Sequence, residues 1–318
     1  MPNTIELAQS YLPLLDDVYR VGSRTAVLDD TGIEFIGANT IKLPKVSTTG
    51  LRNYDRNTGF VKGSVHLEWT PKVLERDRGI SFVIDRMDNE ESASILMPPG
   101  TANGVRDVPD AVATRFGGLL GHFVRHHVAP EVDAYTFAKL AGIDGISLES
   151  ADITAGDAAL GAVRAAAQAM NDAEVPSEGR LLFVSEAFHS LIEGAITRTV
   201  QNGETDIRGF VNSLYGMTVI GVPSGRFNTA ITLNETENSD PDSPGFVPAE
   251  GSYPINFMIV HPTAVAKTFK HVMPRIFTPD VYQGADAYKL DYRIYYDVFA
   301  YDNKLAGIYA NVGTQANS

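Results

Sequence analysis

The sequence predicts an α+β protein, and three features lead to this prediction. Residues 41–91 alternate apolar and polar side chains at the period of two that β-strands require. A long helical pattern follows between residues 107 and 140. Beyond it, residues 154–262 read as strands and helices in mixed order, which indicates a small α/β domain.

Residues 41–91 are predicted to form a long β-hairpin arm that has no core of its own. The turn-rich stretch 48–59 would be its polar tip. Because an isolated two-stranded ribbon is only marginally stable in water, such an arm must lean on another surface. The alternating apolar residues of the return limb are Val65, Leu67, Trp69, Ile80, Phe82 and Ile84.

The arm also carries charges of both signs, in the runs 75–78 and 85–91, which suit pairing across an interface. Trp69 is expected to anchor either such an interface or a core. These features indicate part of an assembly before they indicate a catalyst. The residues expected to contact a neighbouring subunit are Arg52, Tyr54, Arg56, Lys62, Trp69, Arg76, Arg78, Arg86, Asp88, Glu90 and Glu91.

The N-terminal segment permits two interpretations. Residues 4–19 place apolar residues on one stripe, as a short amphipathic helix would. Pro13 would kink or end that helix, so an extended arm is the other interpretation.

Between residues 107 and 140, apolar side chains recur at helical spacing. Asp107 and Asp110 fall in or before the first turn, where the helix dipole favours negative charge. Pro130 is expected to kink the helix. We interpret this element as a structural spine.

The remainder of the chain alternates between helices and strands. A helix is expected from Thr154, with Asp157 resembling a capping box. Residues 234–252 hold five acidic residues and no basic one, so we expect a loop in solvent. The other expected elements are strands at 181–184, 218–222 and 257–260, a helix at 186–197, and C-terminal strands through Tyr292, Ile294, Tyr296 and Val298 and through Ile308 and Tyr309.

The composition excludes several classes of function. The chain has 318 residues, 44% of them hydrophobic and 20% charged, which is typical of globular proteins. A net charge of −13 argues against gripping nucleic acid by its phosphates, but it suits a container that repels the polymer. Without cysteine there are no disulfides and no thiolate chemistry. We also expect synthesis in the cytoplasm and no membrane insertion, since neither a secretory signal nor a long apolar run is present.

Motifs that carry chemistry give no positive support for an enzyme. Phosphate-binding glycine patterns and the nucleophile elbow are absent from the sequence. His122 and His126, with Glu131 nearby, have the spacing of a metal-binding pair on a helix. The glutamate of a His-Glu-x-x-His motif is replaced by Phe123, so an exposed helix edge or a subunit contact is the simpler interpretation. No catalytic, cofactor-binding or metal-binding residue is predicted, and a metal-dependent enzyme is kept as an alternative.

Several segments together resemble the major capsid proteins of tailed bacteriophages, whose Hong Kong 97-like shell fold is shared with encapsulins. They span most of the chain in one order. Residues 94–108 and 234–252 depart from the family pattern as apparent insertions. The similar segments are residues 3–19, 77–91, 130–139, 179–185, 221–227, 257–262 and 304–309.

The resemblance implies a division of the chain into four regions. Residues 1–40 would form the N-terminal arm and residues 41–91 the extended hairpin loop. Residues 92–153 and 263–318 would form the peripheral domain with its spine helix, and residues 154–262 the α/β axial domain.

The resemblance further implies a structural, non-enzymatic subunit of an icosahedral phage head. Such subunits assemble into pentamers and hexamers around double-stranded DNA, without sequence-specific binding and without a cofactor. The implied location is the virion, after assembly in the bacterial host cytoplasm. The implied partners are other copies of the chain, a portal, and, where the phage has them, a separate scaffolding protein and a decoration protein. An encapsulin-like compartment, which would enclose a protein cargo, is the alternative within this fold.

Overall fold

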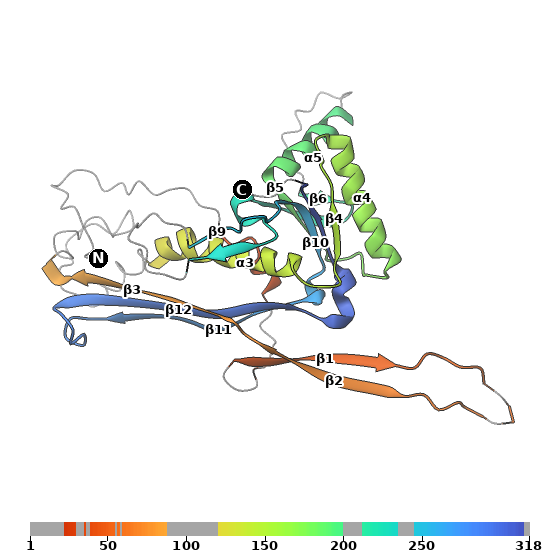
Figure 1. Ribbon diagram of the computed structural model, residues 1–318, viewed down its shortest axis with the longest axis horizontal. Coiled ribbons are helices and arrows are strands. Elements are labelled where there is room, and N and C mark those ends of the chain that lie inside the picture. The colour runs from red at the N-terminus through yellow and green to blue at the C-terminus, as the bar shows by residue number, and fades with distance from the viewer. Residues whose placement is uncertain are drawn as a thin grey trace.

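Two sheets and a projecting ribbon organise the chain (Figure 1). The computed structural model describes residues 22–29, 35, 39–54, 56–57, 59–87, 120–199, 212–234 and 245–314. The larger sheet has six strands in the order β4-β13-β10-β5-β7-β6, and the smaller has three in the order β11-β12-β3. In the part of the chain that is described, no helix combines the length and the apolar character needed to cross a membrane.

The six-stranded sheet is mixed. Its central strand β5 (Leu181–Ser185) pairs antiparallel with β10 (Ile255–Val260) and parallel with β7 (Met217–Val222). β13 (Ile308–Val312) pairs antiparallel with β10 and parallel with the edge strand β4 (Ser147–Ser150). β6 (Ser213–Leu214) forms the opposite edge.

Helices α4 (Gly156–Asp172) and α5 (Glu186–Thr199) cover one face of this sheet. Because strand residues alternate between faces, Leu182 and Val184 pack with α4 and α5, while Leu181 and Phe183 pack on the opposite side. The two resulting cores explain why residues 181–184 read as a continuous apolar run.

The three-stranded sheet is built around β12 (Ala287–Ala300), flanked by β11 (Val265–Phe277) and β3 (Arg76–Asp85). Tyr292, Ile294 and Tyr296, which the sequence predicts on one face of a strand, are buried against helix α3.

Helix α3 (Ala129–Ala141) lies between the two sheets. Its Val132 and Tyr135 pack against β12 of the smaller sheet, whereas Phe137 and Leu140 pack into the core of the larger one. The helix therefore has two apolar faces, which is the arrangement expected of a spine. The predicted helix 107–140 is described from residue 120 onward, and residues 107–119 lie outside the described residues.

A π-helical turn, η2 (Val124–Val128), precedes α3. Pro130 follows it within the first positions of α3. Proline has no N–H to donate and its ring crowds the preceding turn, so a wider turn at this point accommodates it within one continuous helix. The expected effect of Pro130 thus appears as a local change of helical type.

The buried carboxylate of Asp133, on α3, joins several distant segments. It accepts hydrogen bonds from Thr25 Oγ1 at 2.7 Å, from the Thr25 and Arg24 backbone N–H groups at 3.1 and 2.9 Å, and from Arg226 at 3.2 Å. Ser23 Oγ also donates to it, at 2.8 Å. Arg226 ends the 3-10 turn η3 (Ser224–Arg226), and so links the helix to the region of the larger sheet.

Lys267, on β11, extends this network to the smaller sheet. Its ammonium group donates to Thr25 Oγ1 at 3.0 Å and lies 2.6 Å from an oxygen of Asp29. Burial lowers the pKa of Lys267, and the contact with Asp29 opposes that shift. We call Asp133, Arg226, Lys267 and Thr25 the buried polar network.

The strand register differs from two sequence predictions about pairing. β3 pairs with β12 and not with β1, so the predicted hairpin of residues 41–91 is a hairpin only up to Val73. β4 and β13 pair within the six-stranded sheet, so a boundary at residues 154 and 262 cuts across that sheet. The physical reason is that the period of a strand identifies its buried face but not its partner.

Two local predictions also differ from the structure. Helix α4 begins at Gly156 after Ala155, which makes no side-chain cap, so the capping box at Thr154 is not formed. A Cβ at Gly156 would lie 2.5 Å from the Leu191 carbonyl oxygen, so α5 packs against this helix end.

The acidic stretch 234–252 is not wholly a loop. β9 (Phe246–Pro248) pairs with β8 (Ile231–Leu233), and Ser252 is buried. Residues 235–244, which hold four of the five acids, lie outside the described residues.

Replacing the carboxylate of the buried polar network should destabilise the fold. In Asp133→Asn, Arg226 loses its charged partner in a site closed to water, which typically costs about 3–5 kcal/mol. Urea unfolding of the purified protein should therefore show a clearly lower midpoint. The exposed Asp144→Asn is the control and should leave the midpoint unchanged. An unchanged midpoint in Asp133→Asn would show that the network contributes little to stability.

Candidate subunit interface

The ribbon consists of β1 (Thr40–Thr48) and β2 (Val65–Val73), paired antiparallel along their whole length. Figure 1 shows it projecting from the body of the protein, with its tip clear of every other labelled element. The register runs from Thr40 opposite Val73 to Thr48 opposite Val65. Residues directly opposite each other share a face, so this register assigns each side chain to one of two faces.

One face of the ribbon is apolar and exposed. Its members are 50% to 75% exposed to solvent, which is unusual for so many large apolar side chains in one place. We call this set the apolar ribbon face. It consists of Val46, Val65, Leu67, Trp69 and Val73. The register places Pro44 and Pro71 on the same side, together with Thr40, Lys42 and Thr48.

The opposite face attaches the ribbon to the body at its base. Ile41 and Leu43 are buried with Leu74 and Ala266, the latter on β11. Further out, the same face carries the exposed polar residues Lys45 and His66. At its base, the ribbon packs apolar side chains of one face against the body of the protein. The apolar side chains of the other face have no cover in the described structure.

Two contacts with the 3-10 turn η5 (Asp302–Gly307) hold the base of the ribbon further. Asn303 Nδ2 donates to the Val46 carbonyl at 3.0 Å, and Lys72 lies 3.8 Å from Asp302. The base is therefore fixed in direction while the outer part is free to meet another surface.

The tip closes through hydrogen bonds between Thr49 and Ser64. The Thr49 N–H donates to the Ser64 carbonyl at 3.0 Å, and the Ser64 N–H donates to Thr49 Oγ1 at 2.9 Å. Beyond them, the rings of Tyr54 and Phe60 lie 4.9 Å apart. The predicted contact residues of the tip, Arg52, Tyr54, Arg56 and Lys62, are all exposed.

Arg76 and Arg78, also predicted as inter-subunit contacts, are engaged within the chain. The Arg78 guanidinium donates to both carboxylate oxygens of Glu131, at 2.8 and 3.2 Å. It also donates to the Asn234 carbonyl at 2.6 Å, so it holds the base of the acidic stretch against α3. Both side chains of the pair are largely buried.

The Arg76 guanidinium lies over the ring of Tyr135, 5.1 Å from its centre. Burial and the Asp297 carboxylate raise the pKa of Tyr135, so its hydroxyl stays protonated and donates to Asp297 at 2.9 Å. Arg86 is exposed, whereas Asp88, Glu90 and Glu91 lie outside the described residues.

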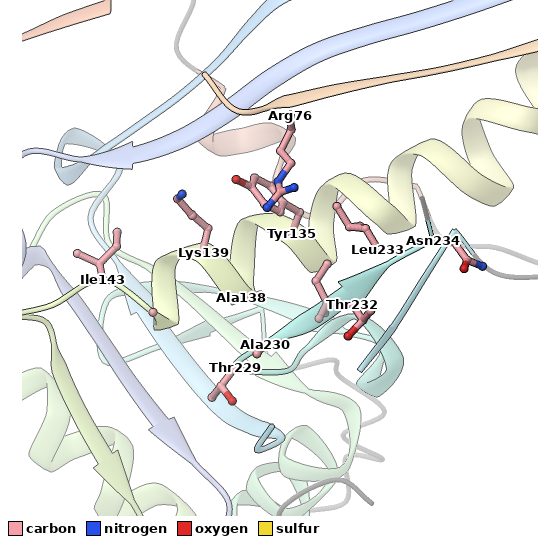
Figure 2. A pocket seen from close by; sticks show the side chains of 12 residues that line it. Arg76, Tyr135, Ala138, Lys139, Ile143, Thr229, Ala230, Thr232, Leu233 and Asn234 are labelled. Atoms are coloured by element: carbon pink, nitrogen blue, oxygen red, sulfur yellow. The ribbon is translucent and has the colours of Figure 1, made fainter. Parts of the chain in front are cut away.

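A groove of about 850 Å³ runs between α3 and the edge of β8 (Figure 2). Arg76, Tyr135 and Lys139 line one wall, and residues 229–234 line the other. The Arg76 guanidinium contacts the ring of Tyr135, and Lys139 Nζ lies 3.4 Å from Glu75 Oε2. Arg76 and Lys139, the charged groups of the groove, therefore have structural partners within the chain.

The histidine pair considered as a metal site takes a different arrangement. The rings of His122 and His126 stack with centres 4.0 Å apart, in the helical turn before α3. Glu131, the third candidate ligand, binds Arg78 instead. Among the residues that the structure describes, no group of three His, Asp or Glu side chains is placed to hold a metal ion.

Sequence reasoning identified Val65, Leu67 and Trp69 of the apolar ribbon face as alternating apolar residues, but it missed the buried polar network. It named Trp69 as a contact but not Val46 and Val73, which the strand register places on the same face. The sequence signal for the apolar ribbon face was the alternation of apolar and polar residues. No local signal marked Asp133, because its partners lie about a hundred residues away.

No family model matches the chain, and no curated protein matches it. Among solved structures, the capsid of the cyanophage P-SCSP1u aligns with a TM-score of 0.64 at 11% identity, covering 98% of this chain and 94% of that one.

Two further structures agree. The mature capsid of bacteriophage PhiM1 gives a TM-score of 0.60 at 12% identity, over 98% of this chain and 93% of that one. A structure from Mycobacterium phage Che8 gives 0.61 at 14% identity, over 99% and 98%. The chain has a phage capsid fold.

This capsid fold confirms the α+β fold class predicted from the sequence. The alignment with the cyanophage capsid covers almost the whole of both chains, so the two sheets, the helix between them and the ribbon are compared together. At identities of 11% to 14% the likeness concerns the fold, and the ribbon residues of this chain have to be judged by their own geometry.

Trp69 is the only tryptophan of the chain, and its side chain is 53% exposed on the apolar ribbon face. Trp69→Ala should therefore change the free energy of unfolding of the unassembled protein by no more than about 0.5 kcal/mol. Phe183→Ala, which removes a fully buried ring, is the contrasting variant and should cost about 3–5 kcal/mol. Equal losses in urea unfolding would place Trp69 in the subunit's own core.

Substitutions of Arg78 and Arg52 should distinguish an arginine that is bonded within the chain from one that is exposed at the ribbon tip. Arg78→Ala removes charged hydrogen bonds to Glu131 and should lower the stability of the unassembled protein by about 2 kcal/mol. Arg52→Ala, at the exposed tip, should lower it by less than about 0.5 kcal/mol. Chemical denaturation of both variants would test this, and an unaffected Arg78→Ala would mean that its contacts with Glu131 are not formed in solution.

Proposed function

We propose that this chain is a structural subunit of a tailed-phage head and that copies of it assemble into a closed shell. The observation that carries the proposal is the apolar ribbon face. Five large apolar side chains stand on a fixed strand pair that projects from a protein with a capsid fold. Exposed apolar patches of this kind are typical of surfaces that become covered by a partner.

A second copy of the chain is the partner that this arrangement favours. The ribbon base is held by Leu43 and Asn303, so the ribbon leaves the body in one defined direction. A surface that projects in a fixed direction from identical subunits makes a repeated head-to-tail contact, and such contacts close into rings when the rotation permits. Rings of five and six copies, pentamers and hexamers, are the form we propose.

The proposed shell encloses double-stranded DNA without binding its sequence. A net charge of −13 supports this role, because a wall that repels the phosphates leaves the packaged polymer unattached. The proposed place of action is the virion, after assembly in the bacterial host cytoplasm, and no enzymatic activity is proposed. A portal is the expected further partner, and scaffolding and decoration proteins are expected where the phage encodes them.

The capsid fold also supports a division into regions. We propose that the ribbon, residues 40–73, is the extended loop, and that the three-stranded sheet with α3 belongs to the peripheral domain. The six-stranded sheet would then be the core of the axial domain, with β4 and β13 included. The predicted range 154–262 would be widened accordingly.

The test uses the full chain, expressed with the other head proteins of its phage. Electron microscopy should show closed shells for the wild-type chain. Leu67→Ser together with Trp69→Ser should abolish shells while leaving the helix content of the unassembled chain unchanged, because both residues lie on the apolar ribbon face. The matched control is Ser47→Ala with His66→Ala, on the opposite face of the same ribbon, which should still assemble.

The outcomes separate the alternatives. A wild-type chain that stays monomeric in sedimentation under these conditions would refute the proposed function. Particles that contain a protein cargo and no DNA would instead identify an encapsulin-like compartment. Normal shells from the double serine variant would show that the apolar ribbon face is not the contact.

A further inference from the structure

The groove between α3 and β8 follows the edge of β8 that lies away from β9 (Figure 2). Residues 229–234 line this groove, whereas no described residue of β9 does. Its volume of about 850 Å³ lies within the range of pockets that bind ligands, about 300–1,000 Å³. The groove therefore gives access to one edge of a β-strand.

The register of the β8–β9 hairpin decides which backbone groups face the groove. At one end of the ladder, the Asn234 N–H donates to the Gly245 carbonyl at 2.9 Å. Because hydrogen-bonded and non-hydrogen-bonded pairs alternate in an antiparallel ladder, Ile231 and Leu233 direct their N–H and C=O groups away from β9. Among the described residues, none is hydrogen-bonded to these groups. The edge of β8 is therefore open.

This edge lacks the features that usually protect an exposed strand. Proline and charged residues commonly interrupt such edges. The other strand of the hairpin has Pro248, and the long edge strand β11 has Pro274. The three residues of β8, by contrast, are isoleucine, threonine and leucine. An open edge of this kind can receive an extended segment as an added strand, which is a common way to bind peptides.

The opposite wall of the groove is basic, with Arg76 and Lys139 as its charged residues. Arg76 contacts the face of the Tyr135 ring, but it forms no ion pair with a described carboxylate, and its Nε has no hydrogen-bond partner there. Lys139 pairs with Glu75, whose side chain is 60% exposed, and surface pairs of this kind contribute little to stability. Both cations can therefore receive a carboxylate that enters the groove.

The ribbon of a second copy does not match this charge. Residues 40–73 contain six Lys and Arg against two Asp and Glu, so they carry a net positive charge. In the groove they would meet Arg76 and Lys139, and like charges that are brought together oppose association. The occupant that suits the groove is acidic.

We propose that the groove binds an extended acidic segment of a separate protein, which adds to the open edge of β8 as a third strand. The segment pairs with the backbone groups of Ile231 and Leu233, and its carboxylates face Arg76 and Lys139. Backbone pairing supplies the affinity, and the two cations supply the selection for acidic sequences. This inference goes beyond the proposed function and does not depend on shell formation.

A library of short random peptides, selected on the purified full chain, tests the inference. The selected sequences should alternate apolar residues with Asp or Glu. With a selected peptide bound, amide hydrogen exchange measured by NMR should slow about tenfold or more at Ile231 and Leu233. Thr232 is the internal control, because its N–H faces β9 in the register and should keep its rate.

A charge reversal tests the basic wall. Lys139→Glu should weaken binding of the selected peptide about tenfold or more in fluorescence anisotropy, because like charges then meet in the groove. The matched control is Lys62→Glu at the exposed ribbon tip, which should bind the peptide as the wild-type chain does. Urea midpoints of both variants verify that they are folded. The same peptide with N-methyl groups on the amides that would pair with β8 should not bind.

The remaining outcomes would overturn the inference. These are a library that yields no binding peptide, selected peptides that are basic, equal binding to Lys139→Glu, or unchanged exchange at Ile231 and Leu233. In assembled shells without peptide, the two amides should exchange as they do in the unassembled chain. Slower exchange in shells would show that a second copy fills the groove, which excludes a separate partner. Absence of shells would refute the proposed function and leave the peptide results valid.

Discussion

The arrangement of the two sheets depends on the buried Asp133 carboxylate. Helix α3 is shared by both cores, but apolar packing alone permits it to slide or rotate between them. Directional hydrogen bonds from Thr25 and Arg226 remove that freedom, since a carboxylate that is out of place would be left buried and unpaired. Lys267 carries the same constraint to β11. The ribbon direction follows from this, because Ala266, the neighbour of Lys267, packs under the ribbon base.

The sequence predicted single elements better than the relations between them. β12 was recognised from the period of two of its buried residues, whereas β5 was recognised as a continuous apolar run because both of its faces are buried. The partner of β3 was missed, since Phe82 alternates in the same way whether its strand continues a hairpin or joins β12. Residues 234–252 were predicted to form a solvated loop from their composition, whereas Arg78 contacts Gly245 and residues 246–248 pair with β8.

The same limits apply to the candidate interface. Trp69 and the tip cations were predicted as contacts from residue type and from their place in a ribbon without a core. Arg76 and Arg78 have the same chemistry as Arg52. Only the fold shows that Arg76 contacts Tyr135 and that Arg78 binds Glu131. Pairing between distant residues therefore decided which charges were left for a neighbour.

The junction between the ribbon and β3 has a mechanical consequence. Leu74 is buried there, and the Glu75 N–H donates to Asp297 at 3.0 Å, so strand β2 passes into β3 without a slack linker. β3 is hydrogen-bonded along β12 from Asp85 to Arg76. A pull on the ribbon tip along its length therefore loads many of these bonds in shear at once, and does not peel them one by one. In the proposed shell, tension from internal pressure would thus be carried by the backbone ladder of the smaller sheet and spread through the body of the protein.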